Sequence, residues 1–286
     1  MSKDTKFSAF TLCVHKKLVT FERPAVMAIL NIGTDSFYDG GRYTTVEEAA
    51  RQAEKLVADG ADIIDIGATS SKPGNRTADA KDEIARFRPV IERIRNMFPD
   101  IIISVDTYLA ESAESAIDAG ADIINDISGG QFDDRMFDTV ARLQVPYILM
   151  HTTALPDEMQ HKCDYNDIVQ DLCLYLSERL NRLYELGVKD IWIDPGFGFG
   201  KTVAQNYELL DRLDELTNIF REPLLAGLSR KSMIYRKLDI TPDEALNGTT
   251  VLNTKALLRG ARILRVHDPK PALEAVKLLY EPYKSI

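Results

Sequence analysis

From residue 25 onward the sequence repeats one unit: a short apolar run, a polar or glycine-containing stretch and an amphipathic helical pattern. Strands that alternate with helices predict a parallel sheet, because each helix returns the chain to the starting edge of the next strand. The chain has eight such units, which predict an α/β fold of the (β/α)8 TIM-barrel type, typically about 250 residues long. The apolar runs are Val26–Ile32, Ile63–Gly67, Ile101–Asp106, Ile123–Ile127, Tyr147–His151, Ile191–Asp194, Leu224–Leu228 and Ile263–Val266.

A doubly wound sheet is the alternative arrangement of such units. That fold more often has a G-x-G-x-x-G turn after its first strand, whereas the first turn here, Asn31–Gly41, lacks this pattern. A barrel also predicts where ligands bind. Active sites in barrels lie at the C-terminal ends of the strands, and phosphate groups are often held by the last two loops.

The sequence also marks helix boundaries. Thr45–Glu48 and Thr241–Glu244 have the capping-box form, and a proline follows Thr241 at the first helical position. The pentapeptide Gly-Ala-Asp-Ile-Ile occurs at 60–64 and again at 120–124, which indicates that one type of helix-to-strand turn is reused. Glycines stand where helices are expected to end, at Gly60, Gly120, Gly187 and Gly260.

The segment before the repeats has a different pattern. Residues 7–22 alternate roughly by twos, with His15-Lys16-Lys17 in the middle, and this predicts a β-hairpin. We therefore divide the chain into a hairpin, residues 1–24, that caps one end of the barrel, and the barrel itself, residues 25–286.

Composition excludes several classes of function. The chain has 286 residues, 45% of them hydrophobic and 28% charged, and a net charge of −9. This charge argues against a nucleic-acid interface, so an anionic ligand must be held by a local cluster of cations and backbone N–H groups. No apolar stretch has the length of a membrane span or a signal sequence. We expect a cytoplasmic protein with small-molecule ligands and reduced cysteines.

The stretch Ile191–Thr202 begins as a strand and continues with three glycines at alternate positions before Lys-Thr. A phosphate-binding P-loop needs another glycine five positions before Gly200, and Pro195 stands there instead. Proline has no N–H and a fixed φ, so it cannot serve that turn. The other interpretation is a loop at the mouth of the barrel, with Asp194 ending its strand and backbone N–H groups open to a flat or anionic ligand.

Polar residues stand at the ends of all eight predicted strands. Carboxylates and amides crowd the third, fourth and sixth strands, whereas cations crowd the last two, which predicts a mouth with an acidic and a basic side. Asp106, Asn125 and Asp194 suit the donor–acceptor edge of a planar heterocycle; alternatively, each caps its following helix. The strand-end residues are Asn31, Asp65, Asp106, Asn125, Asp126, His151, Asp194, Ser229–Lys231, Arg265, His267 and Asp268.

The cations of the last two strands suit a phosphate or diphosphate. Lys231 and Arg265 carry the charge, and His267 stands beside them in the sequence pattern. The alternatives are a solvated helix start at Ser229–Ser232 and a histidine that only supports its neighbours. For His151, a core or loop hydrogen bond is the favoured interpretation.

With these residues assembled, the chain closely resembles the dihydropteroate synthase family of pterin-binding TIM-barrel enzymes, from about residue 25 to its end. Together the matching signatures are far more specific than any one of them. They are Ile29–Gly41, Ser70–Gly74, Ser104–Thr107, Ile124–Ile127, Asp194–Lys201, Ser229–Ser232 and Arg265–Asp268.

The resemblance implies a transferase of folate biosynthesis. Such an enzyme joins p-aminobenzoate to 6-hydroxymethyl-7,8-dihydropterin diphosphate and releases 7,8-dihydropteroate and diphosphate. The resemblance also implies Mg²⁺ as cofactor with Asn31 as its ligand, a homodimer formed through the late helices, and a target for sulfonamides.

By the same resemblance, the site residues form overlapping groups. Pterin binding is assigned to Asp106, Asn125, Asp194, Lys231 and Arg265. Diphosphate binding is assigned to Asn31, Ser71, Lys72, Arg265 and His267. The p-aminobenzoate side comprises Ser71, Lys72, Pro73, Phe199 and Ser229. Catalysis is assigned to Asn31, Asp106, Lys231, Arg265 and His267.

The chain departs from the family pattern in several loops, at Gly33–Thr34, Thr69, Ser71–Lys72 and Thr152–Leu155. The pterin-edge residues are intact, so we expect secure pterin binding with altered p-aminobenzoate kinetics and sulfonamide response. Two other functions remain open. A pterin-dependent methyltransferase has little use for Asn31 together with the cations, and a non-catalytic pterin-binding module would suit the substituted loops.

Overall fold

The computed structural model describes residues 7–14, 17–32, 42–68, 79–154 and 163–281. Eight parallel strands pair in the order β8-β7-β6-β5-β4-β3-β10-β9, and a parallel bridge from Ile193 to Leu224 brings the two outer strands together. The predicted (β/α)8 TIM barrel is confirmed. The strands are β3 (Ala25–Asn31), β4 (Ile63–Gly67), β5 (Ile102–Asp106), β6 (Ile123–Asp126), β7 (Tyr147–Met150), β8 (Ile191–Asp194), β9 (Leu225–Ala226) and β10 (Ile263–Val266).

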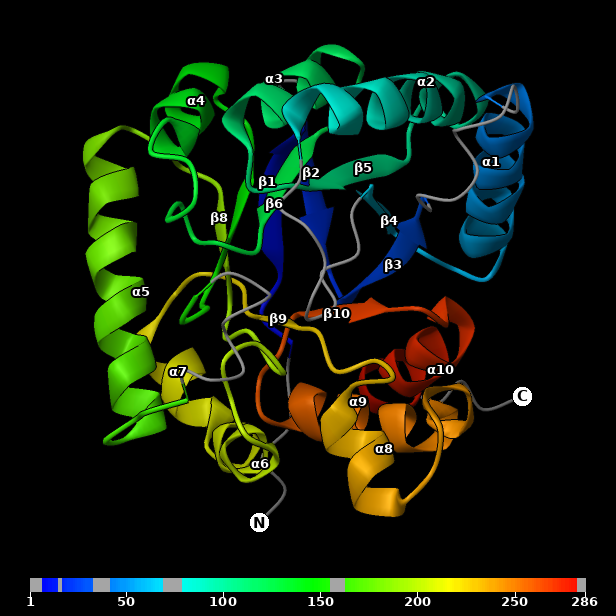
Figure 1. Cartoon of the computed structure of the whole chain (residues 1–286). Coiled ribbons are helices and arrows are strands. Elements are labelled where there is room, and N and C mark those ends of the chain that lie inside the picture. The colour runs from blue at the N-terminus through cyan, green and yellow to red at the C-terminus, as the bar shows by residue number, and fades with distance from the viewer. Residues whose placement is uncertain (1–6, 15–16, 33–41, 69–78, 155–162, 282–286) are drawn as a thin grey trace.

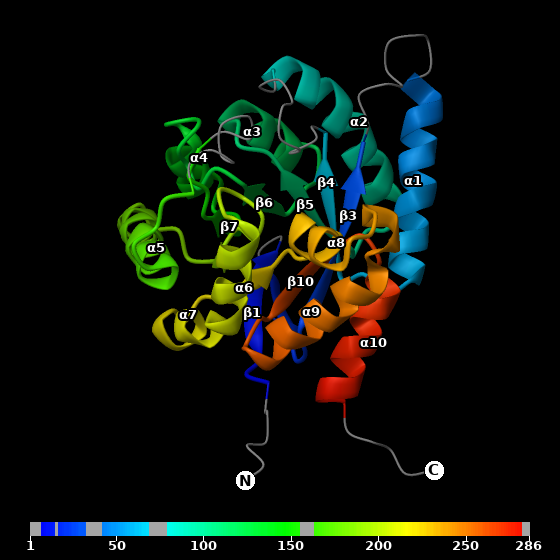
Figure 2. The same ribbon diagram turned by 60° about the horizontal axis from the view of Figure 1, so that its bottom comes forward.

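Helices surround the strands (Figure 1). Among the late helices in Figure 2, α10 packs against β10 and β3, α9 packs against α10, and α8 contacts α9. The apolar faces of the helices and the outward residues of the strands form one large core between the two layers. Within the described segments, no helix is both long and apolar enough to cross a membrane. The helices are α1 (Arg42–Ala58), α2 (Ala80–Met97), α3 (Ala110–Asp118), α4 (Met136–Leu143), α5 (Ile168–Glu185), α6 (Val203–Asp211), α7 (Leu213–Ile219), α8 (Ser232–Leu238), α9 (Leu246–Leu258) and α10 (Pro269–Tyr280).

Most predicted helix boundaries are confirmed, and two helix starts need correction. The capping box at Thr241 is present, but it opens a 3-10 turn, Pro242–Glu244, before α9 begins at Leu246. The helix start expected at Thr45 is wrong, because α1 already begins at Arg42; a Thr and a Glu one turn apart also fit inside a helix. All four predicted helix-ending glycines have positive φ, Gly60, Gly120, Gly187 and Gly260.

The repeated Gly-Ala-Asp turn has a clear physical role at the N-terminal end of the barrel. The carboxylate of Asp62 accepts a hydrogen bond from the backbone N of Val26 at 2.8 Å, and Asp122 does the same for Ile103 at 2.7 Å. An arginine neutralises each carboxylate: Arg23 pairs with Asp62, and Arg95 pairs with Asp122. Each copy therefore joins the start of one strand to the start of its neighbour.

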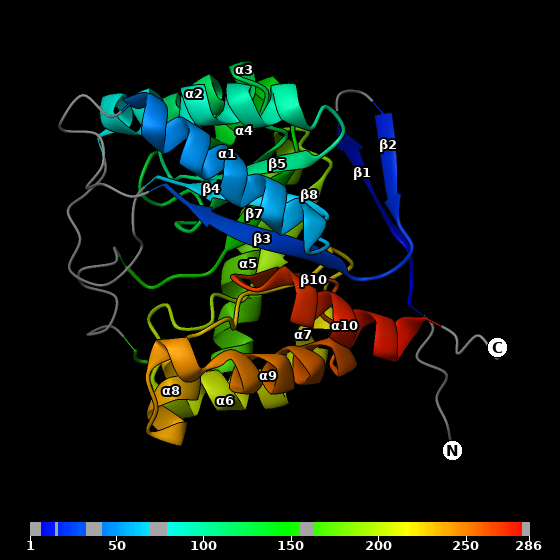
Figure 3. The ribbon, with the colours of Figure 1, turned by 90° about the vertical axis from the view of Figure 1, so that its right-hand side faces the viewer.

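The predicted hairpin consists of β1 (Phe10–Val14) and β2 (Lys17–Phe21), which pair antiparallel. It lies across one end of the barrel (Figure 3). Its apolar face packs on the first inward residues of the strands, in a cluster that includes Trp192. The ring of Phe10 stacks on Phe21 at 4.9 Å and meets Trp192 edge-on at 5.9 Å between ring centroids. The hairpin thus closes the N-terminal end and leaves the C-terminal strand ends for ligands.

Phe10→Ala is expected to lower the free energy of unfolding by about 3 kcal/mol, because a buried ring is lost and the space it leaves cannot refill. Denaturant unfolding followed by circular dichroism measures this change. The exposed hairpin residue Leu18 is the control, and Leu18→Ala should change stability little. Equal losses in the two variants would contradict the packing role of Phe10.

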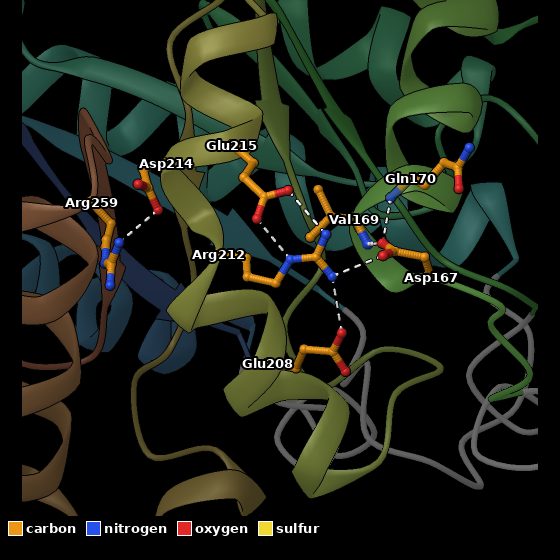
Figure 4. Close-up of polar contacts among 8 residues, drawn as sticks. All are labelled: Asp167, Val169, Gln170, Glu208, Arg212, Asp214, Glu215 and Arg259. Atoms are coloured by element: carbon orange, nitrogen blue, oxygen red, sulfur yellow. Dashed lines mark hydrogen bonds and ion pairs between the residues drawn. The ribbon is translucent and has the colours of Figure 1, made fainter.

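A group of charged side chains fixes the start of α5 to α6 and α7, and a separate pair, Arg259 with Asp214 at 2.8 Å, links the end of α9 to α7 (Figure 4). Arg212 lies between α6 and α7 and contacts Asp167, Glu208 and Glu215 at 2.8–3.1 Å. Asp167 also caps α5 by accepting from the backbone N of Val169 and Gln170. These contacts hold the helical segment that follows β7 against the segment that follows β8.

Candidate active site

The pairing of the parallel strands puts several predicted site residues in one row at the C-terminal end of the barrel. Asn31 pairs with Gly67, Gly67 with Asp106, and Asp106 with Asn125. On the far side of the row, Asp194 pairs with Met150 and ends β8. The expectation that Asn31, Asp106, Asn125 and Asp194 share one mouth is confirmed.

Arg265 lies among the carboxylates and not on a separate basic side. Its Nε donates to Oδ2 of Asp65 and its Nη2 donates to Oδ2 of Asp106, both at 2.6 Å. The prediction of a mouth divided into an acidic and a basic side is therefore wrong for this residue. The physical reason is that β10 pairs with β3, so the closed barrel brings the last strand beside the acidic ones. Arg265 offsets the charges of Asp65, which is fully buried, and of Asp106, which is largely buried; these two carboxylates would otherwise repel each other.

Asp65 is the residue that sequence reasoning left without a role. Its side chain is fully buried, and its Oδ2 accepts from Nδ2 of Asn125 at 3.1 Å as well as from Arg265. Since the amide nitrogen of Asn125 is engaged there, its oxygen is left for a ligand donor. The signal was a carboxylate inside the apolar run of β4, because a charge buried in a strand needs a partner.

Burial shifts the ionisation of the mouth residues toward neutral pH. Burial raises the pKa of Asp106 to about 7. The charge of Arg265 lowers this pKa in part, but the neighbouring carboxylates, above all Asp65, raise it further. Burial likewise raises the pKa of Asp194, against the attraction of Lys231. The pKa of Lys231 is lowered by burial to about 8, although Asp194 attracts the ammonium charge. The site therefore holds titratable groups poised for a change of charge near neutrality.

Lys231 lies between the glycine-rich loop and the carboxylates. Its Nζ donates to the backbone oxygen of Phe197 and lies 4.8 Å from the centre of the Phe199 ring. Phe199 belongs to an apolar cluster with Tyr108 and Met150 at the same end of the barrel. A flat ligand bound beside these groups would contact apolar side chains and would have charged side chains at its edges.

Two of the remaining strand-end residues are His267, which contacts Ser229, and Arg230, which pairs with Asp268. Nδ1 of His267 lies 3.0 Å from Oγ of Ser229, and partial burial, together with the charge of Arg265, lowers the pKa of His267 to about 4. His267 is therefore neutral at pH 7 and offers a hydrogen bond, not a charge. Arg230 points to Asp268, with contacts at 2.9 and 3.0 Å, and stays outside the mouth.

Two further strand-end residues serve the protein itself. Asp126 accepts from Ser128, Gly130 and Tyr147 at 2.7–2.9 Å and so shapes the loop after β6. His151 is buried and its Nδ1 lies 3.0 Å from Nζ of Lys201. The expectation that His151 makes an internal hydrogen bond is confirmed.

Several predicted residues lie outside the described segments. They are Ser71, Lys72 and Pro73, and with them the departures at Gly33–Thr34, Thr69 and Leu155. Asn31, the predicted Mg²⁺ ligand, has an exposed side chain at the mouth. In the described part of the chain, no three His, Cys, Asp or Glu side chains gather in a way that could hold a metal ion.

Comparisons with known proteins agree on one family. The model of the family described as "Pterin binding enzyme" matches residues 27–267. The chain is 43% identical to a dihydropteroate synthase of Streptococcus pyogenes serotype M3 over 267 residues, which cover 92% of this chain and 97% of that protein. It is 41% identical over 260 residues to the dihydropteroate synthase of Synechocystis, with coverages of 90% and 89%.

Solved structures give the same result. The dihydropteroate synthase of Yersinia pestis, in a sulfonamide drug complex, superposes with a TM-score of 0.86 at 36% identity, covering 94% of this chain and 97% of that one. The dihydropteroate synthase of Xanthomonas albilineans with 4-aminobenzoic acid gives a TM-score of 0.86 at 36% identity, with coverages of 95% and 97%.

Proposed function

Because the chain belongs to the dihydropteroate synthase family of pterin-binding enzymes, we propose that its barrel mouth joins p-aminobenzoate to 6-hydroxymethyl-7,8-dihydropterin diphosphate. The enzyme is a transferase of folate biosynthesis. The observation that carries the assignment to this mouth is the contact of Arg265 with Asp65 and Asp106 beside Asn125. It places acceptors for a heterocycle and a fixed cation within one row of strand ends.

The pterin is bound by Asp106, Asn125, Asp194, Lys231 and Arg265. The carboxylates accept from ring N–H groups, and the oxygen of Asn125 accepts a further donor because Asp65 holds its amide nitrogen. Such a set rejects flat ligands that lack matching donors, since buried acceptors would then stay unpaired. The planar guanidinium of Arg265 is held by two carboxylates and can stack on the ring.

The diphosphate is held by Asn31, Arg265 and His267, with Ser71 and Lys72 from the second loop. The amide oxygen of Asn31 is a hard donor of the kind Mg²⁺ takes, and one protein oxygen suffices because this ion keeps water and phosphate ligands. Bound there, Mg²⁺ supplies positive charge to the diphosphate. His267 donates a hydrogen bond, and Arg265 offsets the charge that grows on the leaving oxygen.

The arylamine enters on the side of Phe199 and Ser229, with Ser71, Lys72 and Pro73. The bond from the pterin methylene carbon to the diphosphate oxygen breaks, the electron-rich dihydropterin stabilises the methylene cation, and the amine nitrogen forms the new bond. Its surplus proton leaves to solvent. The amine is neutral from the start, so catalysis consists mainly of positioning and charge stabilisation.

We further propose that the enzyme acts as a cytoplasmic homodimer and is a target for sulfonamides. Support for a dimer comes from exposed apolar residues on the late helices: Leu238 on α8 and Val251 and Leu258 on α9. Sedimentation of the wild type and of a Val251→Asp, Leu258→Asp variant tests it. A wild type that sediments as a monomer would reject the dimer.

The deciding experiment measures diphosphate release from the pterin diphosphate, with and without p-aminobenzoate and with and without Mg²⁺. We expect rapid release only when both are present. Pterin binding without release, whichever arylamine is offered, would instead indicate a non-catalytic module. Transfer of a methyl group from a methyl-pterin to a cobalt cofactor would indicate a methyltransferase.

The pH dependence of kcat/KM for the pterin substrate is expected to be bell-shaped, with its maximum between about 7 and about 8. On the acid side, Asp106 gains a proton near its pKa of about 7, so it loses its charge and one of its oxygens becomes an O–H donor. On the basic side, Lys231 loses its charge near its pKa of about 8. Because kcat/KM reports groups of the free enzyme, a profile that stays flat through neutrality would contradict these roles.

A further inference from the structure

Lys201, which ends the glycine-rich loop, points into the protein. Only 3% of its surface is exposed, and its Nζ lies 2.9 Å from the oxygen of Gly196, 3.0 Å from that of Phe199 and 3.0 Å from Nδ1 of His151. An ammonium group has three N–H donors and no acceptor. Lys201 thus has one acceptor for each donor and needs no ligand to satisfy it.

The two carbonyls that Lys201 holds belong to the segment that carries Asp194 and Phe199. The backbone N of Gly196 donates to Oδ1 of Asp194 at 2.7 Å, so a shift of Gly196 moves a partner of that carboxylate. A Cβ on Gly196 would lie 2.0 Å from the oxygen of His151, and its φ is +69°. The segment therefore passes directly against the end of β7, where no side chain fits.

Two more side chains secure the same segment from outside the mouth. Oδ1 of Asn206, at the start of α6, accepts from the backbone N of Gly198 at 2.7 Å. The hydroxyl of Tyr165 donates to the oxygen of Gly200 at 2.9 Å. Lys201 is the central member of this set, because it binds two carbonyls and a side chain of the neighbouring strand end.

We infer that Lys201 is a positioning residue, which holds segment 194–201 so that the Asp194 carboxylate and the Phe199 ring face the substrates. Lys201 acts through hydrogen bonds to Gly196 and Phe199 and touches no substrate itself. The inference rests on the proposed function for its kinetic consequences. Its structural consequence, an ordered loop in the absence of substrate, stands independently.

The test uses Lys201→Met, which keeps the length of the side chain and removes its donors. We expect the Kd of the pterin diphosphate and the KM of p-aminobenzoate each to rise about tenfold, as for the loss of a few buried hydrogen bonds. Because the chemical groups are untouched, kcat at saturation should change much less. Without substrate, hydrogen exchange of the peptide 195–202 should become faster.

Arg95→Met is the matched control. Arg95 is another largely buried cation that binds carbonyls, those of Pro99, Ile101 and Gly120, at the opposite end of the barrel. This variant should lower the melting temperature and leave Kd and KM unchanged. If Lys201→Met raises the two constants no more than Arg95→Met does, the role of Lys201 is structural only and the inference is wrong.

If Lys201→Met does not fold, Tyr165→Phe decides the question. It removes one hydrogen bond from the same segment and should raise Kd and KM about two- to threefold; unchanged constants would then overturn the inference. Failure of the proposed function looks different, because the wild type itself would release no diphosphate. In that case hydrogen exchange of 195–202 in Lys201→Met still decides whether Lys201 orders the loop.

Discussion

Arg265→Met is expected to lower kcat/KM by at least about 100-fold, the loss typical when a fixed donor to a developing anion is removed. Arg265 contacts Asp65 and Asp106 at 2.6 Å, so the variant also leaves two buried carboxylates facing each other. The charge of Arg265 limits the rise that burial causes in the pKa of Asp106. Without it, that pKa should move above 7, and pterin binding should need a higher pH.

Steady-state kinetics over a pH series separates these two effects. Loss of the cation that offsets the charge on the leaving group lowers kcat at every pH, whereas protonation of Asp106 lowers affinity only on the acid side. Arg230→Met is the matched control, because Arg230 lies at the same end of the barrel and pairs with Asp268 outside the mouth. Similar kinetics for the two variants would show that Arg265 has no special part in the reaction.

Asp194→Asn is expected to weaken pterin binding by roughly 100-fold, because a hydrogen bond to a charged group contributes about 1.5–3 kcal/mol. The exchange keeps the shape of the side chain and replaces one acceptor with a donor, which faces the ring N–H groups of the ligand. In the wild type, the charge of Asp194 stabilises the ammonium form of Lys231. In the variant, Lys231 should therefore lose its proton more readily. Isothermal titration with the pterin diphosphate measures the affinity.

Asp126→Asn serves as its control. Asp126 is also buried and ends β6, but its oxygens accept hydrogen bonds from Ser128, Gly130 and Tyr147 and do not face a ligand. We expect a lower melting temperature and an unchanged pterin affinity. If Asp126→Asn lowers the affinity as much as Asp194→Asn does, the loss of any buried carboxylate here weakens binding by destabilising the fold. The direct role of Asp194 would then be refuted.

Local patterns predicted the architecture well. Ile63–Gly67, Ile191–Asp194 and Ile263–Val266 were predicted to the residue, because apolar runs bounded by turns record burial directly. The run Leu224–Leu228 was predicted too long, and only Leu225–Ala226 pair as β9. Its neighbours close the barrel through single contacts such as Ile193 to Leu224, and no local pattern distinguishes a paired residue from an extended one.

The sequence by itself determined the repeating strand–helix unit, the end of the barrel where polar residues gather, and the identity of most of them. Only the tertiary structure decided which of these residues touch. Arg265 and Asp65 are 200 positions apart, and they meet because β10 closes the barrel against β3. Lys201 stands in the most ligand-like stretch of the sequence yet faces inward, where three acceptors satisfy its ammonium. Spacing along the chain predicts which residues reach the mouth, whereas charge pairing depends on distances in space that form only when the barrel closes.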